Sequence, residues 1–216
     1  KELQMDIKNL QADEFVPIFL EQLSKQSLSK QEQEAVSLLK EWNFEDDQAE
    51  AAPLLFQTIL LELSNVLFGE KISDEMMELF EGKAQVIDEL IRRANEGNEG
   101  PWVKNNGGLS EVIHKALKQT IETLSERYGE DMSDWKWGEE HQLQFSHPLS
   151  SVSPLQYIFN RKDAIPVSGS AVTVQAARRN DETGLVNHGA SWRYIIDTSE
   201  FTKAHHILAP GQSGHF

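Results

Sequence analysis

The residues that could carry out chemistry lie mostly in the second part of this 216-residue chain, which contains no cysteine. Six of the seven histidines come after Trp135. His141 and His147 are six residues apart, which fits neither the i,i+4 pair of a helical metal site nor a short hairpin. We therefore expect ordinary hydrogen-bonded histidines, His205 and His206 included, and no metal ligands. The absence of cysteine excludes disulfides, Cys-ligated zinc, iron–sulfur clusters and thiol nucleophiles.

Carboxylates and serines offer two further kinds of chemistry. Glu45-Asp46-Asp47 and Glu139-Glu140 are acidic runs. Runs of this kind usually lie on solvated faces, whereas general acid–base catalysis needs carboxylates with a perturbed pKa in a pocket. Ser168-Gly169-Ser170 and the glycine-flanked Ser213 do not match the G-x-S-x-G nucleophile elbow, so we expect glycine-rich turns there. The calcium-loop pattern is absent from the sequence as well. Patterns alone therefore reveal no complete catalytic set.

One aromatic and histidine-rich segment is more specific. Trp135-Lys136-Trp137-Gly138 leads through His141 and Phe145 to His147-Pro148-Leu149. In an extended chain the two tryptophans would point to the same side, and their N–H groups would need partners when buried. A loop packed under the helical part of the chain is the structural alternative to a functional role.

The charge divides the chain into two parts. Residues 1–134 contain 28 acidic and 13 basic residues, which gives −15, and residues 135–216 contain seven of each. The net charge of the whole chain is therefore that of its first part. The acidic excess argues against a nucleic-acid-binding surface, which needs clustered Lys and Arg. The apolar runs are short, so we expect no membrane-spanning segment.

Residues 1–134 are predicted to be helical. Ser29 and Glu32 fit a capping box. Pro53 is tolerable only in the first turn of its helix, and Ser110 is the predicted cap of the last helix, which ends at Gly129. The Gly- and Asn-rich stretch Asn95–Gly108 is predicted to be a loop. Apolar spacing of three to four residues predicts helices over Leu10–Leu23, from Ser29 to Trp42, and over Ala49–Phe68, Asp74–Phe80, Ala84–Ala94 and Ser110–Tyr128.

Residues 135–216 are predicted to form loops and strands. The strands are expected at Ala171–Gln175, Ser191–Asp197 and His206–Ala209, with a turn at Asn180–Gly184. An acidic helical region, 1–134, followed by an aromatic segment and strands, 135–216, is an α+β arrangement. Because three strands make a poor sheet alone, we expect partner strands outside this chain.

Four segments of this chain occur in an order and at spacings that resemble the penicillin acylase family of N-terminal-nucleophile hydrolases. The helical stretches Leu38–Trp42 and Ala51–Phe56 fit the same family. The resemblance places the chain in the C-terminal part of the β-subunit, as a fragment of a larger protein. The four segments are Trp135–Leu149, Val167–Val174, His188–Asp197 and Pro210–His215.

This resemblance implies a layered α-β-β-α sheet core and a precursor that cleaves itself. Family members use the new N-terminal Ser as nucleophile, with its own α-amine as base and an oxyanion hole beside it. The expected function is cleavage of a side-chain amide of the β-lactam antibiotic type through an acyl-enzyme. The nucleophile, the acyl pocket and the family's calcium site are expected outside this chain, so the fragment alone should hold no cofactor and be inactive.

Partners and location follow from the same resemblance. The expected partners are the rest of the β-subunit, the α-subunit and a small-molecule amide, with no nucleic acid and no membrane. The expected location is secreted or periplasmic. The alternative function is a non-enzymatic acidic helical interaction module with a β-rich tail.

Asp197 is the candidate catalytic residue of this chain. In some relatives, a carboxylate at the end of a late β-strand orients a His near the nucleophile, and Asp197 matches that strand-end position. Such a carboxylate fixes the tautomer of the His and stabilises its charged form. Two structural alternatives stay open: Asp197 caps the strand end, or it pairs with Arg193, four residues back on the same strand.

Overall fold

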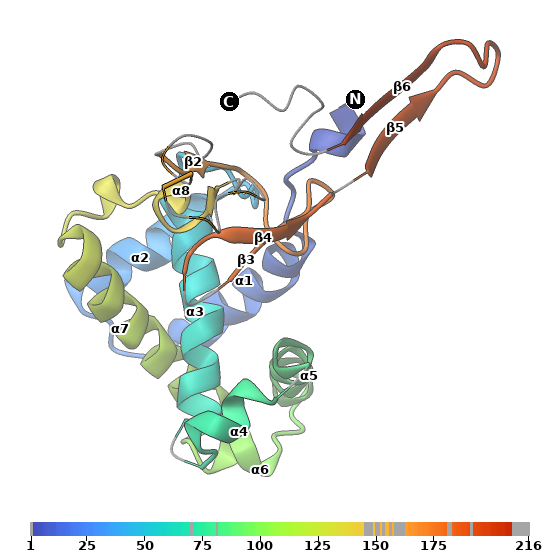
Figure 1. The fold of residues 1–216 in the computed structure, drawn as a ribbon. Coiled ribbons are helices and arrows are strands. Elements are labelled where there is room, and N and C mark those ends of the chain that lie inside the picture. The colour runs from blue at the N-terminus through green and yellow to red at the C-terminus, as the bar shows by residue number, and fades with distance from the viewer. Residues whose placement is uncertain are drawn as a thin grey trace. The chain divides into compact units, whose positions relative to one another are not determined.

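The structure is a computed structural model that describes residues 2–69, 71–80, 82–144, 149, 152, 154–155, 157, 163–180, 183–190 and 192–208. Over these residues the fold is α+β, with eight α-helices and three pairs of short strands (Figure 1). The chain forms two compact units. The helical unit comprises Gln11–Asn43 and Ala51–Trp135, and the strand unit comprises Lys1–Leu10, Phe44–Glu50 and Lys136–Phe216.

The helical unit is organised around one long apolar helix, α3, which packs against α2, α5, α6 and α7. By length and composition α3 would also fit a membrane span, but 61% of it is buried, as expected for the central helix of a bundle. Phe15, Phe19 and Phe56 form an aromatic chain in this core. The helices are α1 (Leu10–Leu23), α2 (Lys30–Glu41), α3 (Ala51–Phe68), α4 (Asp74–Glu78), α5 (Lys83–Asn95), α6 (Pro101–Lys104) and α7 (Leu109–Tyr128).

The predicted helices are confirmed, with two corrections. The Ser29–Glu32 capping box is formed, and Pro53 lies in the first turn of α3. The stretch predicted as a loop contains α6, because Pro101 occupies a position at the start of a helix where it loses no hydrogen bond. Ser110 is not the cap of α7. The N-cap is Gly108, and the hydroxyl of Ser110 donates to the carbonyl oxygen of Gln22 instead.

The strand unit assembles segments that are far apart in the sequence. Asp46 N donates to Ile7 O at 2.9 Å, and Gln175 N donates to Asp6 O at 2.8 Å, so the N-terminal residues are tied to both later segments. The three strand pairs are all antiparallel. The elements are η1 (Glu2–Met5), α8 (Trp137–Glu140), β1 (Gln142–Leu143) with β2 (Ile165–Pro166), β3 (Ala177–Arg179) with β4 (Val186–Gly189), and β5 (Trp192–Ile196) with β6 (Ala204–Leu208).

Two of the three predicted strands are confirmed over the residues described, as β5 and β6. The third prediction, Ala171–Gln175, is wrong, because this segment turns. The hydroxyl of Thr173 accepts from Ser170 N at 2.9 Å and donates to Gln175 O at 2.8 Å. These local bonds replace the ladder bonds of a strand. The hairpin β3–β4 was not predicted, since its polar residues show no clear alternation. The predicted turn at Asn180–Gly184 lies between its two strands.

Candidate functional site

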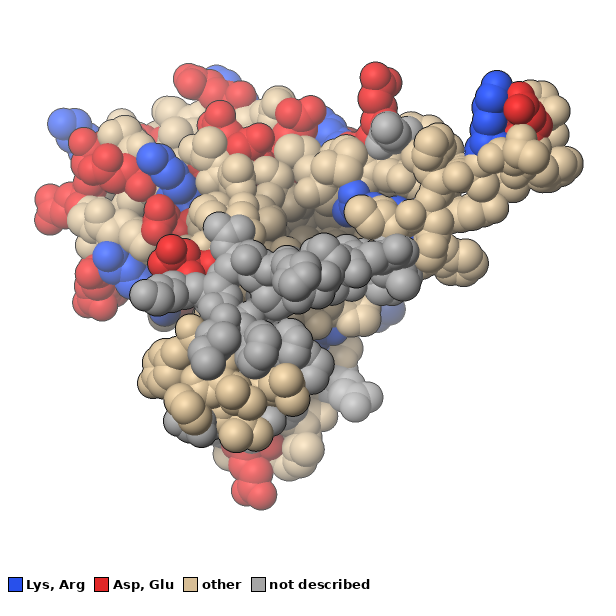
Figure 2. Space-filling model, turned by 45° about the horizontal axis from the view of Figure 1, so that its top comes forward, with Lys and Arg blue, Asp and Glu red and all other residues tan. Residues whose placement is uncertain are grey.

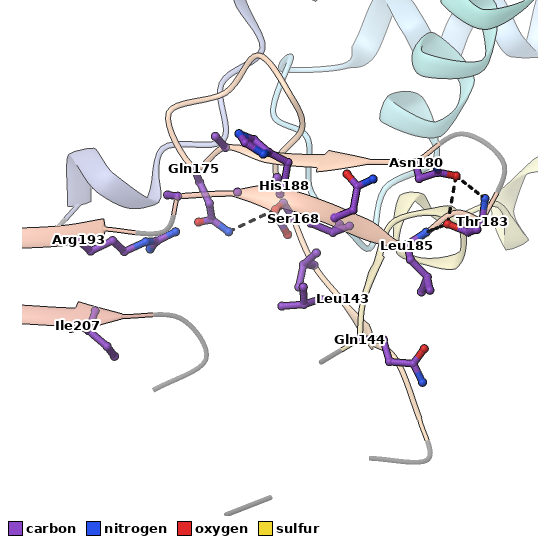
Figure 3. A pocket seen from close by; sticks show the side chains of 17 residues that line it. Leu143, Gln144, Ser168, Gln175, Asn180, Thr183, Leu185, His188, Arg193 and Ile207 are labelled. Carbon is purple, nitrogen blue, oxygen red and sulfur yellow. Dashed lines mark hydrogen bonds between the residues drawn. The ribbon is translucent and has the colours of Figure 1, made fainter. Parts of the chain in front are cut away.

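The strand unit contains a cavity of about 960 Å³ (Figure 3), which falls in the size range of small-molecule pockets. Its wall includes residues of both β3 and β4. Gln175 Nε2 donates to Ser168 O at 3.3 Å, and both of these residues line the cavity. Apolar residues from several strands contribute much of the lining. The lining residues are Leu143, Gln144, Val167, Ser168, Gln175, Ala176, Ala177, Asn180, Thr183, Leu185, Val186, Asn187, His188, Gly189, Ala190, Arg193 and Ile207.

The lining of this cavity differs in charge from the chain as a whole. Arg193 and His188 reach it, whereas none of the described residues that line it is Asp or Glu. The chain carries 35 acidic residues against 20 Lys and Arg, so a cavity lined by no Asp or Glu of the described residues differs from the acidic composition of the whole chain. A surface of this kind is electrostatically compatible with a neutral or anionic group.

His141 contacts the carbonyl oxygens of two residues that line the cavity. It is fully buried, with 0% of its side chain exposed. Its Nδ1 lies 2.6 Å from Val167 O, and its Nε2 lies 2.8 Å from Ala177 O. Val167 and Ala177 both line the cavity. The predicted ordinary hydrogen-bonded role of His141 is therefore confirmed, and the two bonds hold segments that are ten residues apart in sequence.

The charge of His141 depends on opposing effects. Burial lowers the pKa of His141 below its usual range, the carbonyl oxygens of Val167 and Ala177 act to raise it, and the nearby Arg179 lowers it further. A neutral imidazole has only one N–H, so it can donate to only one of the two carbonyl oxygens at a time. The ring therefore donates a hydrogen bond to both carbonyl oxygens only when it is protonated.

Trp137 and Arg179 complete the environment of His141. The Trp137 ring stacks on His141 at 4.5 Å between centroids, and its Nε1 donates to Gly169 O at 2.9 Å. The guanidinium of Arg179 lies 5.4 Å from the centroid of the Trp137 ring and pairs with Glu140 at 2.9 Å. Both side chains of that ion pair are close to 90% buried. The indole N–H of Trp137 thus has the partner that its burial requires.

The glycine after Trp137 is explained by close packing. A Cβ at Gly138 would lie 2.8 Å from Pro166 Cβ and 3.0 Å from Gln48 O. Gly138 N donates to Gln48 O at 2.8 Å. The Trp137-Gly138 pair therefore lets α8 approach both the 44–50 segment and β2. Trp135, which belongs to the helical unit, donates its indole N–H to Gly129 O at 3.0 Å.

Asp46 is a second buried ionisable group in the strand unit. Its side chain is 0% exposed, so it does not lie on the solvated face that its acidic neighbours predicted. Burial raises the pKa of Asp46 to about 6, although hydrogen bonds from Ser170 and Asn9 act to lower it. Gly169 N donates to Asp46 O at 2.7 Å. Asp46 thereby joins the N-terminal segment to the Ser168–Ser170 turn, whose expected glycine-rich structure is confirmed by Gly169 at φ +91°.

Asp197 lies at the end of β5, where the hairpin turns toward β6. Its Oδ1 accepts from Ser199 N at 2.9 Å and from Ser199 Oγ at 2.6 Å. These bonds hold the pKa of the Asp197 carboxyl below its usual range. The strand-end cap is thus formed, whereas Arg193 turns to the cavity and donates to Met5 Sδ at 2.9 Å. The role of Asp197 in orienting a catalytic His stays a prediction.

The remaining predicted residues are spread over the unit. Ser168 lines the cavity and accepts from Gln48 N at 3.0 Å. His205 and His206 are on β6. Phe145, Ser146, His147, Pro148 and residues 209–216, which include Ser213, lie outside the described residues. Across the described ranges no three His, Asp or Glu side chains are grouped as a metal site would require.

The segment around His141 is unusual in the sequence, but its sequence does not predict that His141 contacts two carbonyl oxygens. The acidic run around Asp46 predicted a solvated side chain, whereas Asp46 is buried. The Trp137-Gly138 dipeptide was a usable signal for close packing. Nothing local in the sequence identifies Val167 and Ala177 as the partners of His141, because they lie 26 and 36 residues away.

Comparison with known proteins places this chain in one family. A stretch of 130 residues is 31% identical to the penicillin acylase 2 proenzyme of Pseudomonas sp. (strain SE83), and it covers 60% of this chain but only 15% of that relative. The chain therefore spans a small part of the length of the proenzyme it matches. The sequence pattern of the family described as penicillin amidase matches residues 1–216, the whole chain. This chain belongs to the penicillin amidase family.

Proposed function

We propose that this chain is part of an amidohydrolase that cleaves the amide between an acyl group and an amine, of the type found in the side chain of β-lactam antibiotics. The observation that carries the proposal is the family match over residues 1–216. The relative from Pseudomonas is described as a proenzyme, which supports processing of a longer precursor. The nucleophile would be a Ser at the N-terminus created by that processing, outside these 216 residues.

The chemistry of such an enzyme assigns this chain a supporting role. The Ser Oγ attacks the amide carbonyl and its α-amine takes the hydroxyl proton. The α-amine then gives this proton to the amide nitrogen as the C–N bond breaks, so the amine leaves and the acyl-enzyme remains. Water then releases the acid. In this proposal Asp197 would orient a His that lies near the nucleophile. The cavity of about 960 Å³, which Arg193 lines and no described Asp or Glu lines, is a separate surface of the same unit.

Partners and location belong to the same proposal. The chain would assemble with the rest of a β-subunit and with an α-subunit, and the mature enzyme would work outside the cytoplasm. Cell fractionation of a host that expresses the complete gene tests the location. Mass measurement of the purified protein tests the processed subunits.

The decisive experiment uses the full-length protein that contains this chain. Expression should give two chains, with Ser at the N-terminus of the one that contains these residues, and release of amine from acyl-amide β-lactams should be measurable. Replacing that Ser with Ala should abolish hydrolysis. A full-length protein that stays in one piece and releases no amine would instead favour the acidic helical interaction module.

A further inference from the structure

Arg193, on the wall of the cavity, lacks the partner that an arginine usually has. The residue is half-buried. Its guanidinium donates to Met5 Sδ at 2.9 Å, and a thioether is only a weak acceptor. No Asp or Glu of the described residues forms an ion pair with it. By contrast, Arg92, Arg93 and Arg179 each pair with a glutamate. Arg193 therefore keeps N–H donors that can bind a further acceptor.

The carboxylates of the β5–β6 hairpin do not supply this acceptor. Asp197 follows β5 four residues after Arg193, which corresponds to roughly 13 Å along an extended chain. Its carboxylate is bound by Ser199 instead. Glu200 pairs with Lys203 at 2.7 Å. Figure 2 shows the acidic side chains of the hairpin at its tip, with uncharged strands behind. An anionic partner for Arg193 therefore has to come from outside the hairpin.

Apolar side chains accompany Arg193 in the lining of the cavity. Ile207 is its direct partner in the register of β5 and β6, so the two side chains lie side by side on one face of the hairpin (Figure 3). Leu143, Val167 and Leu185 add apolar surface from other segments. The described lining contains one Arg and no Lys, Asp or Glu. Such a cavity is complementary to a molecule with one negative charge and an apolar body.

We propose that this cavity binds a small amphipathic monocarboxylate, with its carboxylate paired to Arg193 and its apolar part against Ile207 and Leu143. The planar guanidinium of arginine matches a carboxylate with two parallel hydrogen bonds. A single cation in an apolar lining favours a monoanion over a phosphate group, which carries up to about two charges. The volume of about 960 Å³ lies in the range that accommodates small organic molecules.

Isothermal titration calorimetry on the full-length protein that contains this chain tests the class of ligand. The probe is octanoate. The controls 1-octanol and octylamine keep the apolar chain but replace the carboxylate with a neutral or a cationic group, and acetate keeps the carboxylate without the chain. We expect octanoate to bind about tenfold or more tightly than each control, because charge and apolar chain both contribute to affinity. No binding of octanoate, or equal affinity for octanoate and 1-octanol, would overturn the proposal.

Substitutions of Arg193 in the same protein test the residue that holds the carboxylate. Arg193→Gln removes the charge, and we expect it to weaken octanoate binding about tenfold or more while affinity for 1-octanol changes little. Arg193→Lys keeps the charge but loses the two parallel hydrogen bonds, so its affinity should be intermediate. The matched control is Arg178→Gln, which removes an exposed arginine of β3 that does not line the cavity. Equal octanoate affinity in Arg193→Gln and Arg178→Gln would overturn the proposal.

Photo-crosslinking of the unsubstituted full-length protein locates the ligand without depending on the folding of a variant. The probe is an octanoate analogue with a diazirine near the end of its chain. We expect the label on peptides that contain Leu143, Leu185 or Ile207, and we expect an excess of octanoate to prevent it. Labels confined to other parts of the protein would overturn the proposed site.

This inference goes beyond the proposed function and does not depend on it, because neither calorimetry nor cross-linking uses hydrolysis. A protein that hydrolyses acyl amides but does not bind octanoate in this cavity would reject the inference alone. A protein that binds octanoate there but releases no amine would reject the proposed function alone.

Discussion

Asp46 receives the side-chain amide of Asn9 on both carboxylate oxygens, at 3.2 and 3.0 Å, although the two residues are 37 positions apart. Both side chains are 0% exposed. A buried carboxylate without a cationic partner is costly, and the neutral donors Asn9 and Ser170 offset only part of that cost. Asp46 therefore joins two segments of the chain, although its burial disfavours its ionised form.

The first prediction concerns the pH dependence that this carboxylate causes. Its pKa is about 6 in the folded chain, against 3.8 as the ordinary value. Because the folded-state value is raised, stability is greatest below the unfolded pKa and is lost as the pH rises through about 6. The full effect of this difference is about 3 kcal/mol, of which roughly 2.5 kcal/mol falls between pH 4 and pH 7.5. We expect Asp46→Asn to raise the melting temperature of the full-length protein at pH 7.5 and to have less benefit at pH 4.

The control for this prediction is Asp163→Asn, which removes an exposed carboxylate from the same unit. Its melting temperature should follow that of the unsubstituted protein across the pH range. If Asp46→Asn lowered the melting temperature equally at both pH values, the carboxylate would be stabilising, and the buried-charge account would be wrong.

The second prediction is that His141→Phe destabilises the strand unit. Phenylalanine keeps an aromatic ring to stack on Trp137 but removes the ring nitrogens that lie 2.6 Å from Val167 O and 2.8 Å from Ala177 O, and with them the one hydrogen bond that a neutral imidazole donates to these oxygens. Leaving a buried carbonyl group unsatisfied should cost roughly 1–3 kcal/mol. Urea unfolding of the full-length protein, followed by hydrogen exchange at residues 163–190, measures the loss. The matched control is His188→Phe at an exposed cavity position, and a loss equal to that control would contradict the prediction.

The third prediction separates the two buried groups by the sign of their pH dependence. Burial lowers the pKa of His141, so the unfolded chain, with an ordinary value of 6.5, binds a proton more readily than the folded chain. Stability that depends on His141 is therefore lost as the pH falls through 6.5, the opposite of the Asp46 effect. The deficit of His141→Phe should shrink between pH 7.5 and pH 5.5 in thermal melts. A deficit that grows over this range would show that the folded ring is a cation.

The helical part of the fold could be predicted because its signals are local. The spacing of Ser29 and Glu32 predicts the capping box at the start of α2, and the structure forms it. Glu32 also accepts from His114 at 2.9 Å within the helical unit. That second contact joins α2 to α7 across 82 residues and has no local signal. The position of α7 was predicted well, but its start was not, since a hydroxyl at Ser110 can cap its own helix or bond a neighbouring one.

The strand unit was harder to predict because its stability comes from distant contacts. Ala171–Gln175 has the β-branched pattern of a strand, yet the Thr173 hydroxyl satisfies the backbone locally and the segment turns. Asp46 lies between two acidic neighbours, which predicts exposure. Its burial depends on Asn9 and Ser170, which no pattern near position 46 identifies. The segment around His141 could therefore be recognised from the sequence as unusual, but the buried contacts of His141 and Asp46 could not be predicted.

The fourth prediction concerns the helix cap that the sequence identified. Ser29→Ala removes the hydroxyl that accepts from Glu32 N but leaves the Glu32 contact to His114 in place. Glu32→Ala removes the cap partner and the contact to α7 together. We expect about 1 kcal/mol of destabilisation from Ser29→Ala and a larger loss from Glu32→Ala, measured by urea unfolding. Equal losses would mean that His114 contributes nothing to the packing of α2 on α7.

The last prediction separates the two roles of Asp197. As a strand-end cap, the Asp197 carboxylate accepts two bonds from Ser199, and asparagine can accept similar bonds at a turn. As the residue that orients a catalytic His, it must also be charged, because only a carboxylate stabilises the imidazolium form. Asp197→Asn in the full-length enzyme should therefore leave the melting temperature nearly unchanged while lowering kcat/KM and shifting its pH profile. Ser199→Ala is the control, since it weakens the cap but keeps the charge. If kcat/KM and its pH profile were the same in Asp197→Asn as in the unsubstituted enzyme, Asp197 would be a cap and nothing more.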